Sequence, residues 1–174
     1  MNATIAAVVL LLFGGVKQVN GDSLKYEVVG DTVTIKDCKE TASGPLAIPS
    51  IYEGKPVTSI GDWAFIKCAR LTSVTIPDSI TLIGALAFRD CFGLKSVRIP
   101  DSITNIKMGA FSSCSNLTSI IFEGNAPFSF RVDAFSSVPE DAKIFINPGA
   151  TGFGEKFAHL PVIILKELKI NTFS

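Results

Sequence analysis

The residues of this chain with the most reactive side chains are four cysteines and a single histidine. Cys68, Cys91 and Cys114 recur 23 positions apart, whereas a zinc site usually draws on close pairs such as C-x-x-C. A nucleophile activated by histidine would have to reach His159, while Cys91 and Ser113 belong to a different part of the sequence. The spacing therefore predicts no catalytic residue, no metal and no cofactor.

Acidic residues give a second set of candidates for chemistry. Asp78 and Asp101 stand 23 positions apart and would be the oxygen donors of a calcium site between two repeats. Each follows a proline, however, and aspartate is common in such turns because its carboxylate bonds to nearby backbone amides. No two carboxylates have a spacing that implies a shared catalytic site. A turn is the favoured interpretation of both aspartates.

Composition limits the classes of partner. The chain has 174 residues, and its 16 Lys and Arg balance its 16 Asp and Glu, so the formal net charge is zero. A nucleic-acid-binding protein needs a basic stripe, which this balance does not suggest. With 47% hydrophobic residues and 13 phenylalanines, the chain is rich enough in apolar side chains for one sizeable core. We expect one globular domain and no nucleic-acid partner.

The segment 1–21 reads as a secretory signal peptide. An apolar run from Ile5 to Phe13 is too short for a transmembrane helix, which needs about 20 apolar residues. Val19 and Gly21 are small residues at the −3 and −1 positions of a cleavage site. No Lys or Arg precedes the run, and the alternative is a buried N-terminal strand or helix. We expect cleavage after Gly21, a mature chain that is secreted or on the cell surface, and no transmembrane anchor.

The elements that position these residues repeat themselves. Between positions 57 and 122 the same pattern returns with the constant spacing of the cysteines, and Ile-Pro-Asp-Ser-Ile-Thr at 76–81 returns at 99–104. The equivalent apolar residues form three predicted core ladders: Phe65, Phe88 and Phe111; Cys68, Cys91 and Cys114; and Leu71, Leu94 and Leu117. A constant period of this length is typical of a solenoid.

One repeat explains why the others are needed. "LTSVTIP" alternates as a strand with Val74 and Ile76 inward, and Pro77 ends that strand. "SITLIG" turns inward again at Ile80 and Ile83, and "ALAFRDC" follows as a turn or a short helix. A single unit leaves its apolar side open to water, so we expect the units to stack in register.

The pattern "LTSVTIPDSITLIGALAFRDCFGL" resembles the BspA-like leucine-rich repeat, a 23-residue class of bacterial and protist surface proteins. Its unit is written L-x-x-L-x-I-P-x-x-[LIV]-x-x-I-G-x-x-A-F-x-x-C. The match is specific over 57–122 and weaker in "PLAIPSIYEGKPVTSIGDWAF" before it and "FRVDAF" after it. The third unit departs from the pattern, since Lys107 replaces the glycine and Glu123 replaces the proline.

The resemblance implies a short right-handed solenoid with a cap at each end. "LKYEVVGDTVTIKDC" predicts a β-hairpin of strands 26–29 and 32–36 as the N-terminal cap. At the other end, "AKIFINPG" predicts a strand, "ATGFGEKFAHL" a short helix and "VIIL" a last strand. The predicted fold class is a β-rich α/β solenoid over 22–165, with a flexible tail at 166–174.

The repeat geometry bears on the cysteines. Equivalent residues of neighbouring turns lie about 4.8 Å apart with parallel Cβ directions, so a bridge between Cys68 and Cys91 would be strained. Three reduced cysteines in the core are the favoured interpretation. Cys38, which stands outside the period, is the better partner if a disulfide forms. The phenylalanine ladder is likewise interpreted as core rather than as an aromatic ligand slot.

Outward positions of the strands remain as a candidate binding face, because repeat proteins use regular exposed columns to hold partners. The predicted face consists of Ser73, Thr75, Ser96, Arg98, Ser119 and Ile121. The alternative for each column is a merely solvated sheet, and Thr58, Thr81 and Thr104 form another such column.

Three functions follow as hypotheses of different classes. The first, which the resemblance favours, is a non-enzymatic module that binds a protein or glycan in adhesion. The second is a structural protein that associates with copies of itself through exposed repeats. The third is a hydrolase that uses His159.

Overall fold

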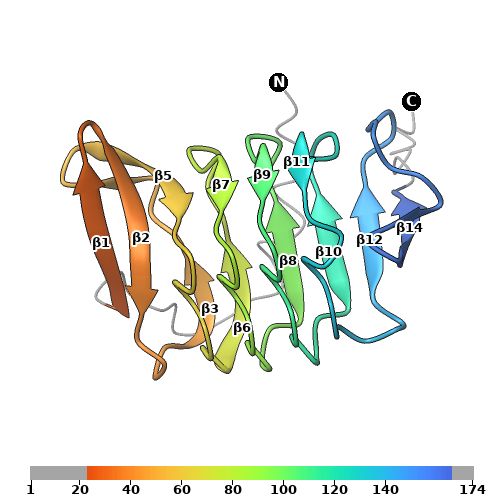
Figure 1. Ribbon diagram of the computed structural model, residues 1–174, viewed down its shortest axis with the longest axis horizontal. Helices are drawn as coiled ribbons and strands as arrows, with labels where there is room; N and C mark the ends of the chain where they lie inside the picture. The colour runs from red at the N-terminus through yellow and green to blue at the C-terminus, as the bar shows by residue number, and fades with distance from the viewer. Residues whose placement is uncertain (1–22, 166–174) are drawn as a thin grey trace, which may run out of the picture.

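The computed structural model describes residues 23–165, which wind into a solenoid with two sheets on two sides of one core (Figure 1). Successive turns of the chain supply one strand to each sheet, and the strands of neighbouring turns pair in parallel. The solenoid predicted from the 23-residue period is therefore confirmed, and it extends by further turns on both sides of the three regular repeats.

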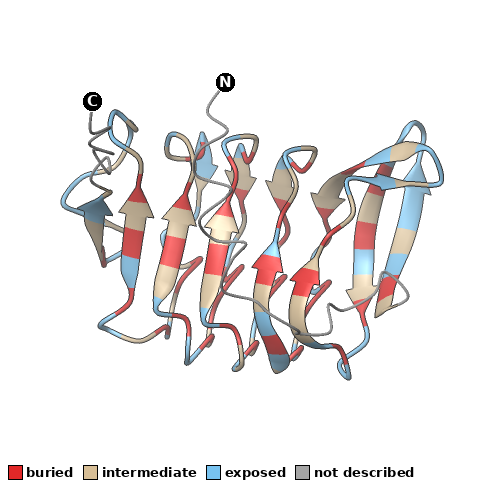
Figure 2. Cartoon of the chain, turned by 180° about the vertical axis from the view of Figure 1, so that it is seen from behind, coloured by how far each residue is buried: buried red, intermediate tan, exposed pale blue. Residues whose placement is uncertain are grey.

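The first sheet, which we call sheet A, contains the strands that follow the recurring pattern of "LTSVTIP". In spatial order it consists of β13 (Lys156–Phe157), β14 (Leu160–Ile164), β12 (Lys143–Ile146), β10 (Ser119–Phe122), β8 (Ser96–Ile99), β6 (Arg70–Thr75) and β3 (Ser43–Ala47). Buried and partly exposed residues alternate along its strands, as Figure 2 shows from behind. Sheet A thus has one face on the core and one face outward.

The second sheet, sheet B, is built from shorter strands. It consists of β1 (Leu24–Val29), β2 (Thr32–Cys38), β5 (Lys55–Ile60), β7 (Leu82–Ile83), β9 (Asn105–Ile106) and β11 (Ser129–Phe130), with β4 (Ile51–Tyr52) paired antiparallel to β5. Each regular repeat contributes a strand of only two residues to sheet B. The tight turn at the proline and the bend after the strand take up the neighbouring residues of the repeat.

The predicted N-terminal hairpin is confirmed. Strands β1 and β2 pair antiparallel around Gly30, whose φ of +59° suits a tight hairpin turn. β2 then pairs in parallel with β5, so the hairpin closes the end of sheet B. Val33 and Ile35 are fully buried and continue the core to this end of the stack.

The three predicted ladders form the centre of the core. All nine of their residues have no exposed surface: Phe65, Phe88, Phe111, Cys68, Cys91, Cys114, Leu71, Leu94 and Leu117. Adjacent rings of the phenylalanine ladder are nearly parallel, with centroids 4.7 Å apart between Phe65 and Phe88 and 5.0 Å between Phe88 and Phe111. Phe135 extends this ladder by one turn, at 5.2 Å from Phe111.

The segments that carry these phenylalanines are turns and not helices. Residues at two positions of each repeat have left-handed backbone, as at Leu86 with a φ of +57° and Asp90 with a φ of +59°. Amides of one turn donate to carbonyls of the next, including Phe65 N–H to Ala87 at 2.7 Å and Phe88 N–H to Ala110 at 2.7 Å. This third hydrogen-bonded ladder satisfies the backbone where a helix would have used its own carbonyls.

The prediction of a C-terminal helix is wrong. Residues 150–160, where the sequence predicts the helix, form a bend followed by β13 and the first residue of its antiparallel partner β14. The described residues contain no α-helix, so the fold is an all-β solenoid rather than α/β. Phe157 packs on Phe130 with centroids 4.4 Å apart and on Phe122 at 5.8 Å. The segment becomes extended because these rings must cover the last turn of the core while β14 pairs with β12.

The predicted strands over "AKIFINPG" and "VIIL" are confirmed as β12 and β14. The signal peptide predicted at 1–21 and the tail predicted at 166–174 lie outside the described residues. Within 23–165, no helix has the length and apolar character needed to cross a membrane.

Candidate binding face

The parallel register of sheet A brings all six predicted face residues onto its outer surface. Ser73, Ser96 and Ser119 lie side by side on β6, β8 and β10 and form the first column. Thr75, Arg98 and Ile121 form the second column two positions further along the same strands. The residues between the columns, such as Val97, point into the core. The face is thus an ordered array set by the pairing of the strands.

Both columns are longer than the sequence pattern indicated. Lys143 continues the serine column on β12. Phe145 and then Ile163 continue the other column on β12 and β14, and Ala47 precedes it on β3. The alternation in "KIFI" and "VIIL" is the signal that identifies these outward positions, once both segments are assigned to the same sheet as the repeats.

The two columns differ in chemistry. The serine column is small and polar, whereas the second column passes from Thr75 through Arg98 to Ile121 and Phe145. Ile163 at its far end is 40% exposed. The face can therefore offer hydroxyl groups along one line and an apolar surface along part of the other.

A single ion pair interrupts the second column. The guanidinium of Arg98 pairs with the carboxylate of Glu123, which follows β10. Glu123 stands where the two preceding repeats have Pro77 and Pro100. This departure from the repeat therefore gives Arg98 a partner on the adjacent turn and fixes its orientation on the face.

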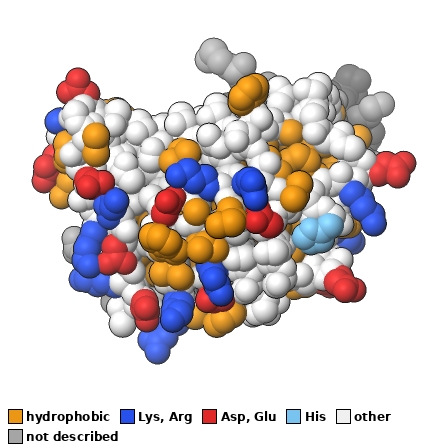
Figure 3. All heavy atoms as spheres, in the orientation of Figure 1, with side chains coloured by type: hydrophobic (Ala, Val, Ile, Leu, Met, Phe, Trp, Pro, Cys, Tyr) orange, Lys and Arg blue, Asp and Glu red, His pale blue; other side chains and the backbone are white. Residues whose placement is uncertain are grey.

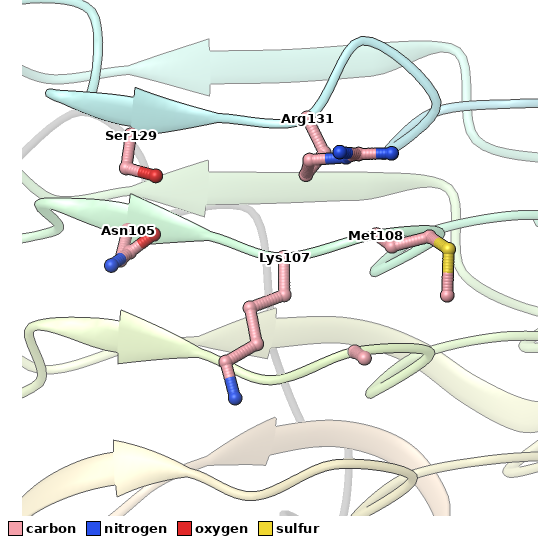
Figure 4. A pocket seen from close by; sticks show the side chains of 6 residues that line it. Asn105, Lys107, Met108, Ser129 and Arg131 are labelled. Atoms are coloured by element: carbon pink, nitrogen blue, oxygen red, sulfur yellow. The ribbon is translucent and has the colours of Figure 1, made fainter.

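The side of the molecule that carries sheet B has a shallow groove of about 360 Å³. It is lined by Ala85, Asn105, Lys107, Met108, Ser129 and Arg131, most of which Figure 4 shows at the ends of β9 and β11. Figure 3 shows hydrophobic side chains gathered over the middle of this side, among basic and acidic ones.

The charges at this groove are paired within the protein. Lys107 reaches Asp62 on an earlier turn at 3.3 Å, and Arg131 lies 3.7 Å from Asp133. The amide of Ala85 donates to Asp62 at 2.8 Å, and this hydrogen bond holds the pKa of Asp62 below its usual value. The cations of the groove are thus already neutralised, which weakens it as a site for an anionic ligand.

Two cysteines of the ladder, Cys91 and Cys114, are poor nucleophiles. Cys91 donates to the carbonyl of Phe65 at 3.1 Å, and Cys114 donates to the carbonyl of Phe88 at 3.1 Å. Burial raises the pKa of Cys91, and it raises the pKa of Cys114 to about 12. Both thiols are therefore protonated at neutral pH and act as small core residues. All four cysteines of the chain are free thiols.

His159 belongs to the C-terminal cap and not to the regular repeats. It occupies the exposed turn between β13 and β14 with a φ of +65°. Among residues 23–165 no serine hydroxyl or cysteine thiol is hydrogen-bonded to it. Asp101 accepts the amide of Asn125 on the following turn at 3.3 Å, so its carboxylate bonds between turns, whereas the sequence predicts a bond within its own turn. Within the described range no group of three or more His, Cys, Asp or Glu is arranged for a metal ion.

Comparison with known families agrees with the repeat geometry. The family described as BspA type leucine rich repeat region matches residues 45–157 with six copies. The chain belongs to the BspA-type leucine-rich repeat family. No protein of curated function matches the chain.

Solved structures with the same repeats are similar to this one. A leucine-rich repeat protein from Bacteroides capillosus shares 30% identity, with a TM-score of 0.53 over 69% of this chain and 95% of that chain. A leucine-rich repeat protein from Bacteroides ovatus shares 27% identity and a TM-score of 0.55, over 83% of this chain and 40% of that one. The T. pallidum leucine-rich repeat protein, at 22% identity, a TM-score of 0.52 and coverage of 74% and 71%, shares the fold.

Proposed function

We propose that this BspA-type repeat protein is a non-catalytic module that binds a protein or glycan through the outer face of sheet A. The observation that carries the proposal is the pair of columns in strict register, with serines along one and Thr75, Arg98 and Ile121 along the other. Because the backbone of sheet A is hydrogen-bonded within the sheet, only side chains on this face are free to contact a ligand. An adhesive role follows from the surface location that is typical of the family.

The proposal includes export of the protein. The apolar run that begins at Ile5 and the small residues Val19 and Gly21 support cleavage after Gly21 and release or display of the mature chain. N-terminal sequencing of the exported protein should begin at Asp22. Recovery of only uncleaved chain inside the producing cells would contradict this part of the proposal.

Binding is tested with the mature chain on a glycan array and on a panel of purified extracellular proteins. A ligand retained by the wild type should lose at least about tenfold in affinity with Ser96→Tyr or Arg98→Glu, because both changes alter the centre of the face. Thr104→Tyr is the matched control, since Thr104 is exposed in the same repeat as Ser96 but precedes β9 of sheet B. Equal retention of the ligand by all three variants would remove this face as the binding site.

The ion pair of Arg98 supplies a second control. Arg98→Glu alone sets two carboxylates together, whereas the double variant Arg98→Glu/Glu123→Arg restores a pair with reversed positions. A partly exposed pair of this kind is worth at most about 1 kcal/mol of stability. If Arg98 contacts the ligand, the double variant recovers thermal stability but not affinity. Recovery of both would mean that Arg98 acts only through the fold.

Self-assembly is distinguished by the mass of the particles. Light scattering over a concentration series should give a constant mass if the face binds a different molecule. Growth in mass that Ser96→Tyr abolishes would replace ligand binding with association between copies of the chain.

A further inference from the structure

Cys38 occupies the end of the cysteine ladder, where the regular contact pattern stops. In the following turns each ladder cysteine donates to the phenylalanine carbonyl of the turn before it, at 3.1 Å for both Cys91 and Cys114. Cys68 belongs to the first regular repeat and has no such carbonyl. Its sulfur instead lies 3.7 Å from the carbonyl of Cys38 and 3.9 Å from that of Lys39. Cys68 is therefore the ladder cysteine with the weakest hydrogen bond.

The sulfurs of Cys38 and Cys68 also approach the same carbonyl oxygen, that of Lys39, at 3.7 Å and 3.9 Å respectively. Cys38 is the last residue of β2 and is 3% exposed, while Cys68 has no exposed surface. The chain before the first regular repeat departs from the repeat pattern, and Cys38 precedes Cys68 by 30 residues rather than by the period of 23. The repeat register that makes the Cβ directions parallel within the ladder therefore does not constrain this pair.

We propose that Cys38 and Cys68 form a disulfide bond when the folded protein meets an oxidising thiol–disulfide medium. The bond ties the N-terminal hairpin and β3 to the first regular repeat. The terminal turn of a repeat stack has only one neighbour and opens most readily, so a covalent link at this place stabilises the weakest end of the solenoid.

The chemistry is a thiol–disulfide exchange with a small disulfide such as oxidised glutathione as the electron acceptor. The thiolate of Cys38 attacks one glutathione sulfur, the glutathione disulfide breaks, and the first glutathione leaves as a thiol. The sulfur of Cys68 then attacks Cys38 Sγ, the mixed disulfide breaks, and the second glutathione leaves. Two electrons and two protons pass from the cysteines to the two glutathiones, so the step balances.

The local environment sets the order of attack. The neighbouring Cys68 side chain lowers the pKa of Cys38, and the proximity of Cys38 raises the pKa of Cys68. Residues 39–41, which follow Cys38, are exposed, so opening of this short turn admits the oxidant. Cys91 and Cys114 lie deeper in the stack, under complete turns on both sides. The pair at the end of the ladder is thus the accessible one.

The test uses the full chain, fully reduced, desalted and incubated folded with oxidised glutathione. Two of the four thiols should be lost, and non-reducing peptide mapping should give one linked pair that contains Cys38 and Cys68. The melting temperature should rise by roughly 5–10 °C relative to the reduced protein. Cys114→Ser is the matched control, because it removes a ladder cysteine and should still form the bond and show the rise.

Cys38→Ser and Cys68→Ser should show no loss of paired thiols and no rise in melting temperature with oxidant. Circular dichroism of the reduced wild type establishes that the fold is intact before oxidation, so the result does not depend on any variant. Four unreacted thiols, a glutathione adduct that persists on Cys38, or a linked pair that contains Cys91 or Cys114 would each overturn the proposal.

Discussion

Truncation of Phe88 to alanine measures how far the stability of the solenoid depends on its aromatic ladder. The ring is completely buried and lies between Phe65 at 4.7 Å and Phe111 at 5.0 Å. Removal of a buried phenylalanine costs about 3–5 kcal/mol, and each aromatic pair contributes about 0.5–1.5 kcal/mol beyond the burial of its area. Because two pairs are lost at once, we expect the upper part of that range, about 4–5 kcal/mol.

The assay is equilibrium unfolding in urea, followed by circular dichroism and by the fluorescence of Trp63, the single tryptophan of the chain. Phe92→Ala is the matched control, since Phe92 lies in the same repeat and is 47% exposed. We expect this control to lose less than about 1 kcal/mol. Equal losses in the two variants, or a loss below about 1 kcal/mol for Phe88→Ala, would refute a core built on the stacked rings.

Three further predictions concern a glycine, an aspartate and a cysteine of the repeats. A Cβ on Gly84 would lie 2.5 Å from backbone atoms of the preceding turn, so Gly84→Ala should lower the free energy of unfolding in urea by about 1–3 kcal/mol. Gly154→Ala is the control: its Cβ would have its nearest neighbour at 3.6 Å, and it should change this free energy by less than about 0.5 kcal/mol. The amide of Ala85 lowers the pKa of Asp62, so the carboxylate of Asp62 stabilises the fold at pH values above its unfolded pKa. This contribution is lost as the pH falls through the folded pKa. Asp62→Asn should therefore make the melting temperature fall less steeply below about pH 4. Because burial raises the pKa of Cys114 to about 12, mass spectrometry should find this thiol unmodified by iodoacetamide at about pH 8 in the folded protein and alkylated in urea.

The regular part of the fold could be predicted from the sequence because every repeat meets the same surroundings. Positions that recur with the period of the repeat, such as Phe65 and Phe88, pack against their own equivalents in the stack. All equivalent positions therefore have the same environment and the same burial. Because these surroundings repeat, the sequence pattern could predict the burial of the phenylalanines. It could also predict the strand that contains Val74 and the turn after Pro77. The hairpin around Gly30 followed from local turn chemistry alone.

The C-terminal cap could not be predicted in this way because its structure depends on distant residues. Residues 155–160, "EKFAHL", have good local helix propensity. Phe157 is nevertheless drawn onto Phe130 and Phe122, which belong to earlier turns, and β14 pairs with β12. Packing against the open end of the core overrides the local preference, and the sequence pattern contains no repeat that would reveal it.

The turns that carry the phenylalanines were equally hard to assign. Non-glycine residues such as Trp63, Lys67 and Leu86 have φ values between +57° and +60°, a conformation that carries no sequence signal at these residue types. Hydrogen bonds to the next turn compensate for this strain: Trp63 donates to Ala85 at 2.9 Å and Lys67 donates to Arg89 at 2.8 Å. Only the stacked chain stabilises this geometry, so it is absent from any single repeat.

The outer column of sheet A is the part of the stack that the fold leaves free. The inward column in the same strands is aliphatic throughout: Val74, Val97, Ile120, Ile144 and Val162. The outward column at the next position along has a different chemistry at almost every strand: Thr75, Arg98, Ile121, Phe145 and Ile163. Since both columns share one backbone, sheet pairing cannot be the reason for the difference. The inward residues meet the requirements of the core, and the outward ones are free to meet those of a ligand, so substitutions at Thr75 or Ile121 should change ligand choice while altering the free energy of unfolding by less than about 0.5 kcal/mol.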